Sequence, residues 1–369
     1  MRVREMRSPI VLAIAALSLV AALAPPLAGV AVTAATPKRQ LGINVLMYPE
    51  YGTKRANLDA AKRMFTYIRS LNANAVALCF QMYPDPNTVA GAVTANGVVA
   101  GDATPSPTYL GEFVDLAHAA GLAVQLRPLL NEDSLHSAGS WRGGIAPTDK
   151  AAWFASYGSF LQPYFAMAHQ HHVETFAIGA ELTTMAPHNR YWLPLISQAR
   201  AVTGSEIIYE ANWNGRASLP AATFGYDDYQ PVSGIATADQ ATVQTLTTKM
   251  ETNLTKSASG GIPVAASESQ LSEVAIAALN QSWTQPWVTT YNPATDTIIR
   301  SVQANWFTAA CNAFHDLGMR GIYFWGLQLN VNYDPAASAD NADPNLAKPY
   351  GWQNTISSDA IKTCFANNS

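Results

Sequence analysis

The feature that most constrains the fold of this chain is an alternation, repeated from residue 41 onward, of short apolar runs with longer amphipathic stretches. Such an alternation is typical of α/β proteins whose strands form a parallel sheet. The runs with the length and composition of strands are residues 41–48, 75–81, 123–129, 175–180, 206–211, 223–229, 262–267 and 321–325. Because eight strands with helical connections close a (β/α)8 barrel, we predict an α/β fold of the TIM-barrel type.

Helical patterns fill the connections between these runs. The predicted helices include residues 58–71, 110–120, 153–171, 192–202, 241–257 and 301–317, and a further one follows near the end of the chain. Long connections rich in Pro, Gly, Asp and Asn cover residues 83–108, 131–149 and 330–354. Each follows a predicted strand, so we expect a single domain with long loops on its C-terminal face, where barrel active sites are built.

The amino-terminal segment has the pattern of an export signal. Arg2, Arg4 and Arg7 precede an apolar run at residues 10–23, and small residues follow as far as Ala35. This order is typical of a secretory signal peptide that is removed from the mature protein. We therefore expect a signal at residues 1–35, a catalytic domain at residues 36–369, and a secreted, extracellular protein.

Charge and aromatic content indicate the class of ligand. Only 13% of the residues are charged, the net charge is −4, and no cluster of Lys and Arg follows the predicted signal. This excludes an electrostatic site for nucleic acid or for an anionic membrane, so we expect a neutral ligand. Nine Trp and fifteen Tyr suit the stacking of aromatic rings on sugars, although core packing accounts for most of them.

The cysteines leave one question open. Cys79 lies in an apolar run and is expected to be buried, whereas Cys311 and Cys364 lie on the last two predicted helices. In an oxidising compartment Cys311 and Cys364 can form a disulfide. The spacing alone leaves both the paired and the unpaired state open.

Two glutamates follow predicted strands and are the candidate catalytic residues. Glu181 comes directly after the small pair Gly179-Ala180, and Glu268 follows residues 262–267. Both carboxyls are therefore expected at the mouth of the barrel. Cleavage of a glycosidic bond needs one carboxyl to protonate the leaving oxygen and a second to attack, and retention of configuration places them roughly 5–5.5 Å apart. The alternative for each is a salt bridge or a loop cap.

Other acids compete for these roles. Glu132 lies in the long loop after the third predicted strand, where it can bind substrate or close a loop hydrogen bond. Glu273 lies near Glu268, and we expect it on the following loop or helix. Asp227 and Asp228 end the sixth predicted strand and can either contact sugar hydroxyls or cap a turn.

Several segments together carry a family resemblance. They are Trp141-Arg-Gly-Gly-Ile-Ala-Pro-Thr-Asp, Trp153-Phe-Ala-Ser-Tyr157, Phe176-Ala-Ile-Gly-Ala-Glu-Leu, Glu210-Ala-Asn-Trp213, Tyr226-Asp-Asp-Tyr229-Gln-Pro, the Glu268 segment and Gly321-Ile-Tyr-Phe-Trp325. With them the chain resembles clan A of the glycoside hydrolases and, within it, most closely family 113, the β-1,4-mannanases. The resemblance covers nearly all of the chain after the predicted signal.

The resemblance implies a retaining double displacement on β-linked mannose polymers. It places the acid/base on Glu181 and the nucleophile on Glu268, with the Tyr229 hydroxyl supporting the nucleophile and Trp325 as the platform under the sugar. Two positions depart from the clan. Ala180 stands where most members have an Asn, which family 113 also lacks, and Ser-Gln follows Glu268 in place of a Gly-aromatic pair.

Further residues are expected to bind substrate. Asn212 and Trp213 close the fifth predicted strand and suit a sugar subsite, with core packing as the alternative for Trp213. Arg127 can orient Glu268 or form a structural salt bridge. Trp141, in a loop over the mouth, is a candidate platform. The residues that can line the cleft beyond these are Tyr48, Glu50 and Tyr83.

We predict neither a metal nor a cofactor. His169, His171 and His172 cluster at a predicted helix end, where the helix dipole and solvent account for them. The acids of residues 330–345 lack the spacing of a calcium loop, although the sequence leaves open whether this loop binds an ion. We expect a monomeric endo-β-1,4-mannanase acting on β-mannan or mannooligosaccharides. The alternatives are another retaining clan A activity, such as a β-glucanase or an exo-acting β-mannosidase, and a non-catalytic carbohydrate-binding barrel.

Overall fold

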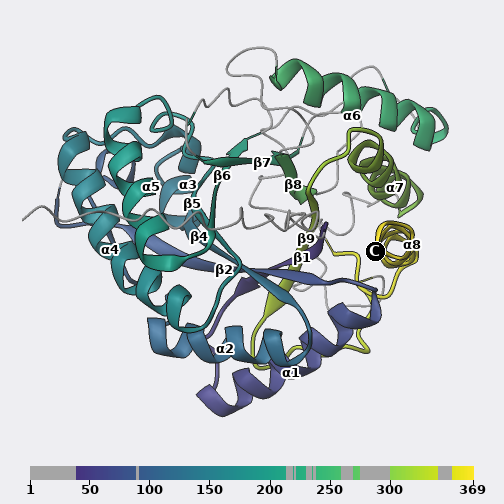
Figure 1. Ribbon diagram of the computed structural model, residues 1–369, viewed down its shortest axis with the longest axis horizontal. Helices are drawn as coiled ribbons and strands as arrows, with labels where there is room; N and C mark the ends of the chain where they lie inside the picture. The colour runs from purple at the N-terminus through teal and green to yellow at the C-terminus, as the bar shows by residue number, and fades with distance from the viewer. Residues whose placement is uncertain are drawn as a thin grey trace, which may run out of the picture. The chain divides into compact units, whose positions relative to one another are not determined.

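Parallel strands form the centre of the structure and helices surround them (Figure 1). The computed structural model describes residues 39–88, 91–212, 219, 222–229, 235, 238–258, 269–274, 300–339 and 351–369. All of these belong to one compact unit of the chain, Lys38–Ser369.

The parallel strands pair side by side in a closed ring. They are β1 (Gln40–Met47), β2 (Ala75–Pro84), β4 (Ala123–Leu130), β5 (Thr175–Ala180), β6 (Glu206–Asn212), β7 (Thr223–Asp228), β8 (Ser269–Val274) and β9 (Gly321–Leu329). The order β1-β9-β8-β7-β6-β5-β4-β2 closes because β1 also pairs with β2. A two-residue strand, β3 (Val98–Val99), pairs antiparallel with the end of β2. The predicted (β/α)8 barrel is confirmed.

Helices connect successive strands and cover the outside of the ring (Figure 1). They are α1 (Lys54–Ser70), α2 (Pro107–Ala119), α3 (Glu132–His136), α4 (Lys150–Gln170), α5 (Asn189–Thr203), α6 (Val243–Ala258), α7 (Arg300–Asp316) and α8 (Ile356–Asn368). Single 3-10 turns lie at Ala92–Thr94, Arg142–Gly144 and Ala238–Gln240. The long predicted helices are present, each with ends within a few residues of the expected ones.

Local sequence determines where several helices start and stop. The Thr53 side chain accepts a hydrogen bond from the Ala56 N–H at the start of α1, and Asp149 accepts from the Ala152 N–H at the start of α4. Each cap satisfies a backbone donor that has no partner within its helix. Gly204 ends α5 with a φ of 71°, a left-handed conformation that glycine adopts without steric cost.

One predicted strand differs from the structure. Residues 262–267 lie outside the described residues, and the strand that occupies the seventh place in the barrel is β8, Ser269–Val274. Its register pairs Glu273 with Asp227 of β7. The expectation that Glu273 lies on a loop or helix after the strand is therefore wrong.

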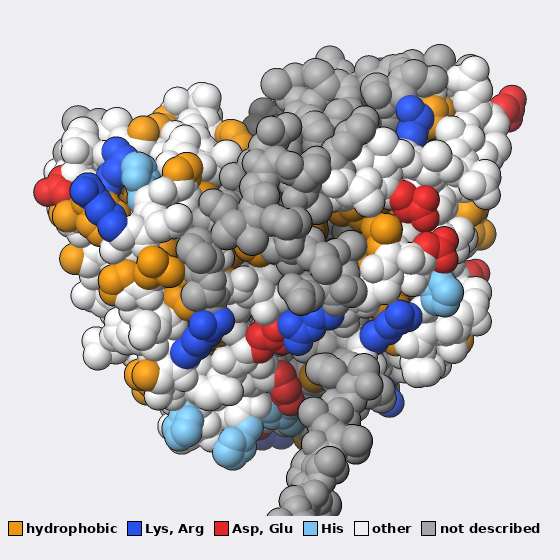
Figure 2. Space-filling view, turned by 45° about the horizontal axis from the view of Figure 1, so that its top comes forward, with side chains coloured by type: hydrophobic (Ala, Val, Ile, Leu, Met, Phe, Trp, Pro, Cys, Tyr) orange, Lys and Arg blue, Asp and Glu red, His pale blue; other side chains and the backbone are white. Residues whose placement is uncertain are grey.

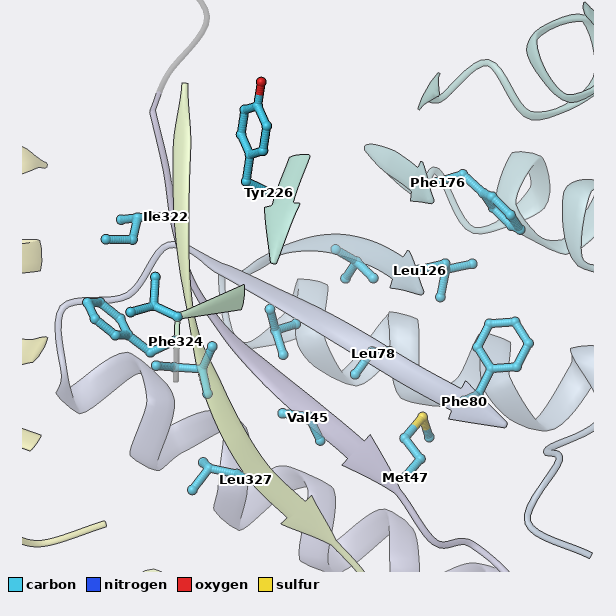
Figure 3. Packing of buried hydrophobic residues seen from close by; sticks show 14 of the residues in the cluster. Val45, Met47, Leu78, Phe80, Leu126, Phe176, Tyr226, Ile322, Phe324 and Leu327 are labelled. Carbon is cyan, nitrogen blue, oxygen red and sulfur yellow. The ribbon is translucent and has the colours of Figure 1, made fainter. Parts of the chain in front are cut away.

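Alternate residues of each strand face the helices and form the main hydrophobic core. Val45 and Met47 of β1, Leu78 and Phe80 of β2, and Phe324 of β9 belong to this core (Figure 3). Strands of a parallel barrel are covered on both faces, which explains why their sequences are nearly continuous apolar runs.

The other face of the strands points into the barrel and carries smaller and polar side chains. Ala75, Ala77 and Cys79 of β2 pack there with Ala180 and the Tyr323 ring. The polar side chains that lie buried with them include Asn44, Gln125, Arg127 and Glu210. Small side chains such as those of Ala75 and Ala77 leave room inside the ring for charged groups, which is where the candidate site begins.

The carboxyl end of the chain is covalently joined to the preceding helix. Cys311 of α7 and Cys364 of α8 form a disulfide with a Cα–Cα distance of 5.7 Å. Cys79 is buried, as expected, and its thiol donates to the Asn44 Oδ1 at 3.6 Å. None of the helices in the described ranges is long and apolar enough to cross a membrane.

Replacing both Cys311 and Cys364 with Ser is expected to destabilise the barrel. The bridge closes a loop with a sequence separation of 53 residues, and a native disulfide of this kind contributes about 2–4 kcal/mol. Urea unfolding of the oxidised protein and of the double variant measures the difference. Equal unfolding midpoints would contradict a stabilising role for this bond.

Candidate active site

Glu181 follows β5 in a backbone conformation that few residues adopt. Its φ is 54°, in the left-handed region, where a residue other than glycine is strained by about 1–3 kcal/mol. Two hydrogen bonds hold this turn: the Glu181 N–H donates to the Glu210 carbonyl at 2.7 Å, and the Glu181 carbonyl accepts from the Thr183 N–H at 2.8 Å. Strain of this kind is common at active sites, where it orients a side chain.

The Glu181 carboxylate is held from two sides. Only 6% of the residue is exposed. Asn212, at the end of β6, donates its side-chain N–H to the Glu181 Oε1 at 3.1 Å. The Arg142 Nε lies 3.5 Å from the Glu181 Oε2 and comes from the 3-10 turn in the loop between β4 and α4. A buried carboxylate thus meets an amide on one oxygen and a guanidinium near the other.

Arg127 forms the centre of a buried network beneath Glu181. Its side chain is fully buried, with its Nε 2.6 Å from the Glu210 Oε2 and its Nη2 donating to the Asp227 Oδ2 at 2.5 Å. Its Nη1 donates to the Asn44 Oδ1 at 3.1 Å, and Gln125 donates to the Glu210 Oε1 at 2.5 Å. Of the two roles predicted for Arg127, the structural salt bridge is therefore present.

The structure also places most of the other predicted site residues. Asp227 binds Arg127 inside the barrel, and Asp228 and Tyr229 are buried at the end of β7. Trp325 lies partly buried in β9, where its carbonyl accepts from the Trp352 indole N–H at 2.9 Å and its peptide bond to Gly326 is cis. Trp213 and Glu268 lie outside the described residues, and β8 begins directly after Glu268 in the chain.

Trp141 is partly buried, and its ring lies against Gly143, two residues later in the chain. A Cβ atom on Gly143 would come within 2.3 Å of the Trp141 ring, so the indole occupies the space that a side chain there would need. The indole is thus held by the same loop that supplies Arg142.

Tyrosines and carboxylates gather where β1 and β2 end. The pKa of Tyr48 is raised to about 12, first by burial and then by the charges of Asp133 and Glu50. Burial also raises the pKa of Tyr83 and of Glu50. Tyr48, Glu50 and Tyr83, which were expected to line the cleft, therefore lie in one neighbourhood with Asp133 of α3. Neutral phenols of this kind can exchange hydrogen bonds with sugar hydroxyls.

The sequence did not identify Arg142, Glu210 or Asn44 as site residues. Glu210 and Asn44 are polar positions within apolar strands, which is the signal that could have located them. Arg142 lies in one of the segments that carry the family resemblance, but nothing in that segment indicates that the Arg142 side chain contacts Glu181. Its contact depends on how the loop after β4 folds back over β5.

No metal centre appears in the part of the chain that the structure describes. No group of three or more His, Cys, Asp or Glu side chains there is placed to hold a metal ion. The His171 Nδ1 lies 2.7 Å from Asp115, and the Asp334 carboxylate accepts from the Ala336 N–H. On the face seen in Figure 2, Lys and Arg side chains lie in separate groups among polar and acidic ones.

Comparison with known proteins identifies the family. The model of glycoside hydrolase family 113 matches residues 51–347. This chain belongs to glycoside hydrolase family 113. It is therefore a clan A glycoside hydrolase whose substrate is an oligosaccharide or a polysaccharide, as the paired acids had indicated. A search of curated protein sequences found no match.

Solved structures of mannan-degrading enzymes share the fold. A family 113 β-mannanase from Alicyclobacillus acidocaldarius, in complex with ManMIm, is 20% identical, with a TM-score of 0.66 over 90% of this chain and 98% of that one. A second family 113 β-1,4-mannanase is 16% identical, with a TM-score of 0.66 over 89% and 99%. An endo-β-1,4-mannanase from Thermotoga petrophila is 14% identical, with a TM-score of 0.52 over 90% and 78%.

Replacing Arg127 with Met is expected to destabilise the barrel by about 3–5 kcal/mol, because two buried carboxylates would lose their cation. The matched control is Arg320→Met, which removes the partly exposed ion pair between Arg320 and Glu206. A pair of that exposure contributes about 1 kcal/mol or less. Urea unfolding of the three proteins measures both differences, and similar losses in the two variants would show that the buried network has no special role.

Proposed function

We propose that this glycoside hydrolase is an endo-β-1,4-mannanase that retains the configuration of the sugar, with Glu181 as acid/base and Glu268 as nucleophile. The observation that carries the proposal is the position of Glu181 in a family 113 barrel. It is buried at the end of the fourth barrel strand, β5, and Asn212 and Arg142 orient its carboxylate. Few structural roles require a strained, buried acid at that place.

The reaction follows from two carboxyl groups on opposite sides of the scissile bond. The protonated Glu181 gives its proton to the glycosidic oxygen as the Glu268 carboxylate attacks the anomeric carbon, and the bond to the leaving sugar breaks with its electron pair on that oxygen. A water molecule then attacks the glycosyl-enzyme and gives its proton to Glu181, which restores both groups.

Aromatic and polar residues near the mouth are proposed to bind the sugars. Trp325 and Trp141 would supply stacking surfaces, and Trp213 would extend the subsite next to Asn212. Tyr229 would support the nucleophile through its hydroxyl, and Asp228 would contact sugar hydroxyls at the end of β7. For Asp227 and Arg127 we propose an indirect role, since both lie in the buried network.

The names of the matched structures support mannan as the substrate, because two of them are family 113 β-mannanases. Exo action is the alternative to endo action, since an exo-β-1,4-mannosidase from an Opitutaceae bacterium shares the fold with a TM-score of 0.55. That match covers 90% of this chain but 60% of the mannosidase, at 12% identity. Product sizes separate the two modes of action.

We expect the protein to release short oligosaccharides from β-1,4-mannan in the first turnovers. Chromatography of the products measures this. The Glu268→Gln variant should be less active than wild type by about 10³-fold or more, because no carboxylate would attack the anomeric carbon. Glu273→Gln is the matched control, since the β8 register sets Glu273 opposite Asp227.

Each other outcome of this experiment has a definite meaning. Loss of activity in Glu273→Gln alone would move the nucleophile to Glu273. Mannose alone from the first turnovers would indicate an exo-acting mannosidase. Products from β-glucans but none from mannan would indicate a β-glucanase, and the absence of products from every β-glycan would leave a carbohydrate-binding barrel.

We further propose that the protein is exported and acts as a monomer. The disulfide between Cys311 and Cys364 supports export, because such bonds persist in oxidising compartments. The mature protein recovered from the culture medium is expected to begin close to residue 36, as amino-terminal sequencing would determine. An amino terminus at Met1 would contradict removal of a signal.

A further inference from the structure

A charged contact next to the candidate acid/base has a role that the proposed reaction leaves unassigned. The Arg142 Nε lies 3.5 Å from the Glu181 Oε2, and the two side chains are 9% and 7% exposed. Charges in so sheltered a place interact more strongly than exposed ones, because water screens them less. An arginine here therefore affects the Glu181 carboxyl directly.

We propose that Arg142 is a positioning residue for Glu181, and that it stabilises the carboxylate form which Glu181 takes after it has given up its proton. The proposal rests on the proposed role of Glu181 as acid/base. It explains why the loop after β4 directs a cation to this point of the mouth.

The backbone around Arg142 is joined to the backbone around Glu181. The Thr184 N–H donates to the Gly143 carbonyl at 3.1 Å, and the Thr184 hydroxyl donates to the Ile145 carbonyl. Both bonds link the 3-10 turn that carries Arg142 to the segment directly after Glu181. Arg142 is therefore fixed relative to the carboxylate by more than its own side chain.

Groups from the neighbouring strands also face Glu181. From β6, Asn212 donates to its Oε1, the Glu210 carbonyl accepts from its N–H, and the Tyr209 hydroxyl lies close enough to respond to its charge. Burial, followed by the charges of Tyr157, Glu181 and Asp227, raises the pKa of Tyr209 well above its usual value, so this hydroxyl stays neutral.

The described charged groups of the network around Arg127 are paired with one another. From β7 and β4, Asp227 and Arg127 bind each other, and the Glu210 side chain contacts Arg127 and Gln125. Among the described residues, Arg142 is a cation in direct contact with the Glu181 carboxylate. Its removal changes the charge at Glu181 while leaving the network around Arg127 in place.

The two halves of the reaction place opposite demands on this contact. In the first half Glu181 loses a proton to the glycosidic oxygen, and a nearby guanidinium favours the carboxylate that forms. In the second half the same carboxylate must take a proton from water, which a cation opposes. The Arg142 Nε contact at 3.5 Å is longer than a charge-assisted hydrogen bond, which is compatible with both steps.

The sign of the expected pH effect follows from this geometry. A cation near a carboxyl favours the ionised form, so replacing Arg142 with the neutral Gln should raise the pKa of Glu181 by about 1–2 units. The first half of the reaction needs protonated Glu181. The alkaline limb of the kcat/KM profile should therefore move to higher pH by a similar amount.

The experiment compares Arg142→Gln, Arg142→Met and Arg142→Lys with wild type over a range of pH on mannooligosaccharides. The matched control is Arg190→Gln, because Arg190 lies on the surface over the Tyr191 ring. Both neutral variants should shift the limb, whereas the Lys variant and the control should keep it near its wild-type position. Two neutral variants are used so that one can replace the other if thermal melting shows that it is unfolded.

A second substrate separates electrostatics from a structural role. A 2,4-dinitrophenyl β-mannobioside has a leaving group that needs no proton, so its kcat/KM should show no shift of the alkaline limb in any variant. A loss of rate at every pH without a shift on mannooligosaccharides, or an equal shift on both substrates, would overturn the proposal.

A direct titration keeps this test independent of activity. In protein with ¹³C-labelled Glu carboxyls, the resonance that disappears in Glu181→Gln belongs to Glu181, and its midpoint should be higher in Arg142→Gln than in wild type. An unchanged midpoint would refute the proposal. Absence of turnover in wild type would refute the proposed function instead, while the titration would still decide whether Arg142 controls the charge of Glu181.

Discussion

The mouth of this barrel depends on one buried cation. Arg127 extends from β4 into the barrel and binds acids from β6 and β7 and an amide from β1, so four strands meet at one guanidinium. Burying such charges is costly unless each has its partners. The small side chains of β2 leave the space that this cluster requires. Glu210, which contacts Arg127 through its side chain, also accepts the Glu181 backbone N–H, so the network supports the turn that presents Glu181.

The candidate site combines this fixed centre with a separate loop. Strand ends supply Glu181, Asn212 and Asp227, whereas Arg142 and Trp141 come from the connection between β4 and α4. This division is typical of (β/α)8 enzymes, in which the strands hold the reacting groups and the loops adapt the cleft. Because the Thr184 N–H donates to the Gly143 carbonyl, that loop is joined to the segment that follows β5, and the adaptable part of the site keeps a fixed relation to Glu181.

Features set by residues close together in the chain could be predicted from the sequence, whereas contacts between residues far apart in the chain could not. Hydrophobic alternation located seven of the eight parallel strands and placed Glu181 at a strand end, since both depend on neighbouring residues. The predicted strand 75–81 was too short, because β2 continues to Pro84 through its pairing with β3, a contact with a distant segment. Arg142 and Glu210 were missed for the same reason. Their partners Glu181 and Arg127 lie far away in the chain, and only the folded barrel brings them together.

The left-handed backbone at Glu181 has an evolutionary consequence. Glycine or asparagine would adopt that φ more easily, and either would also remove an acid from a buried place. Folding alone would therefore select against glutamate at this position, and the proposed catalytic role supplies the pressure that retains it. A descendant that no longer needed to cleave sugars would tend to lose Glu181 early and become more stable by doing so.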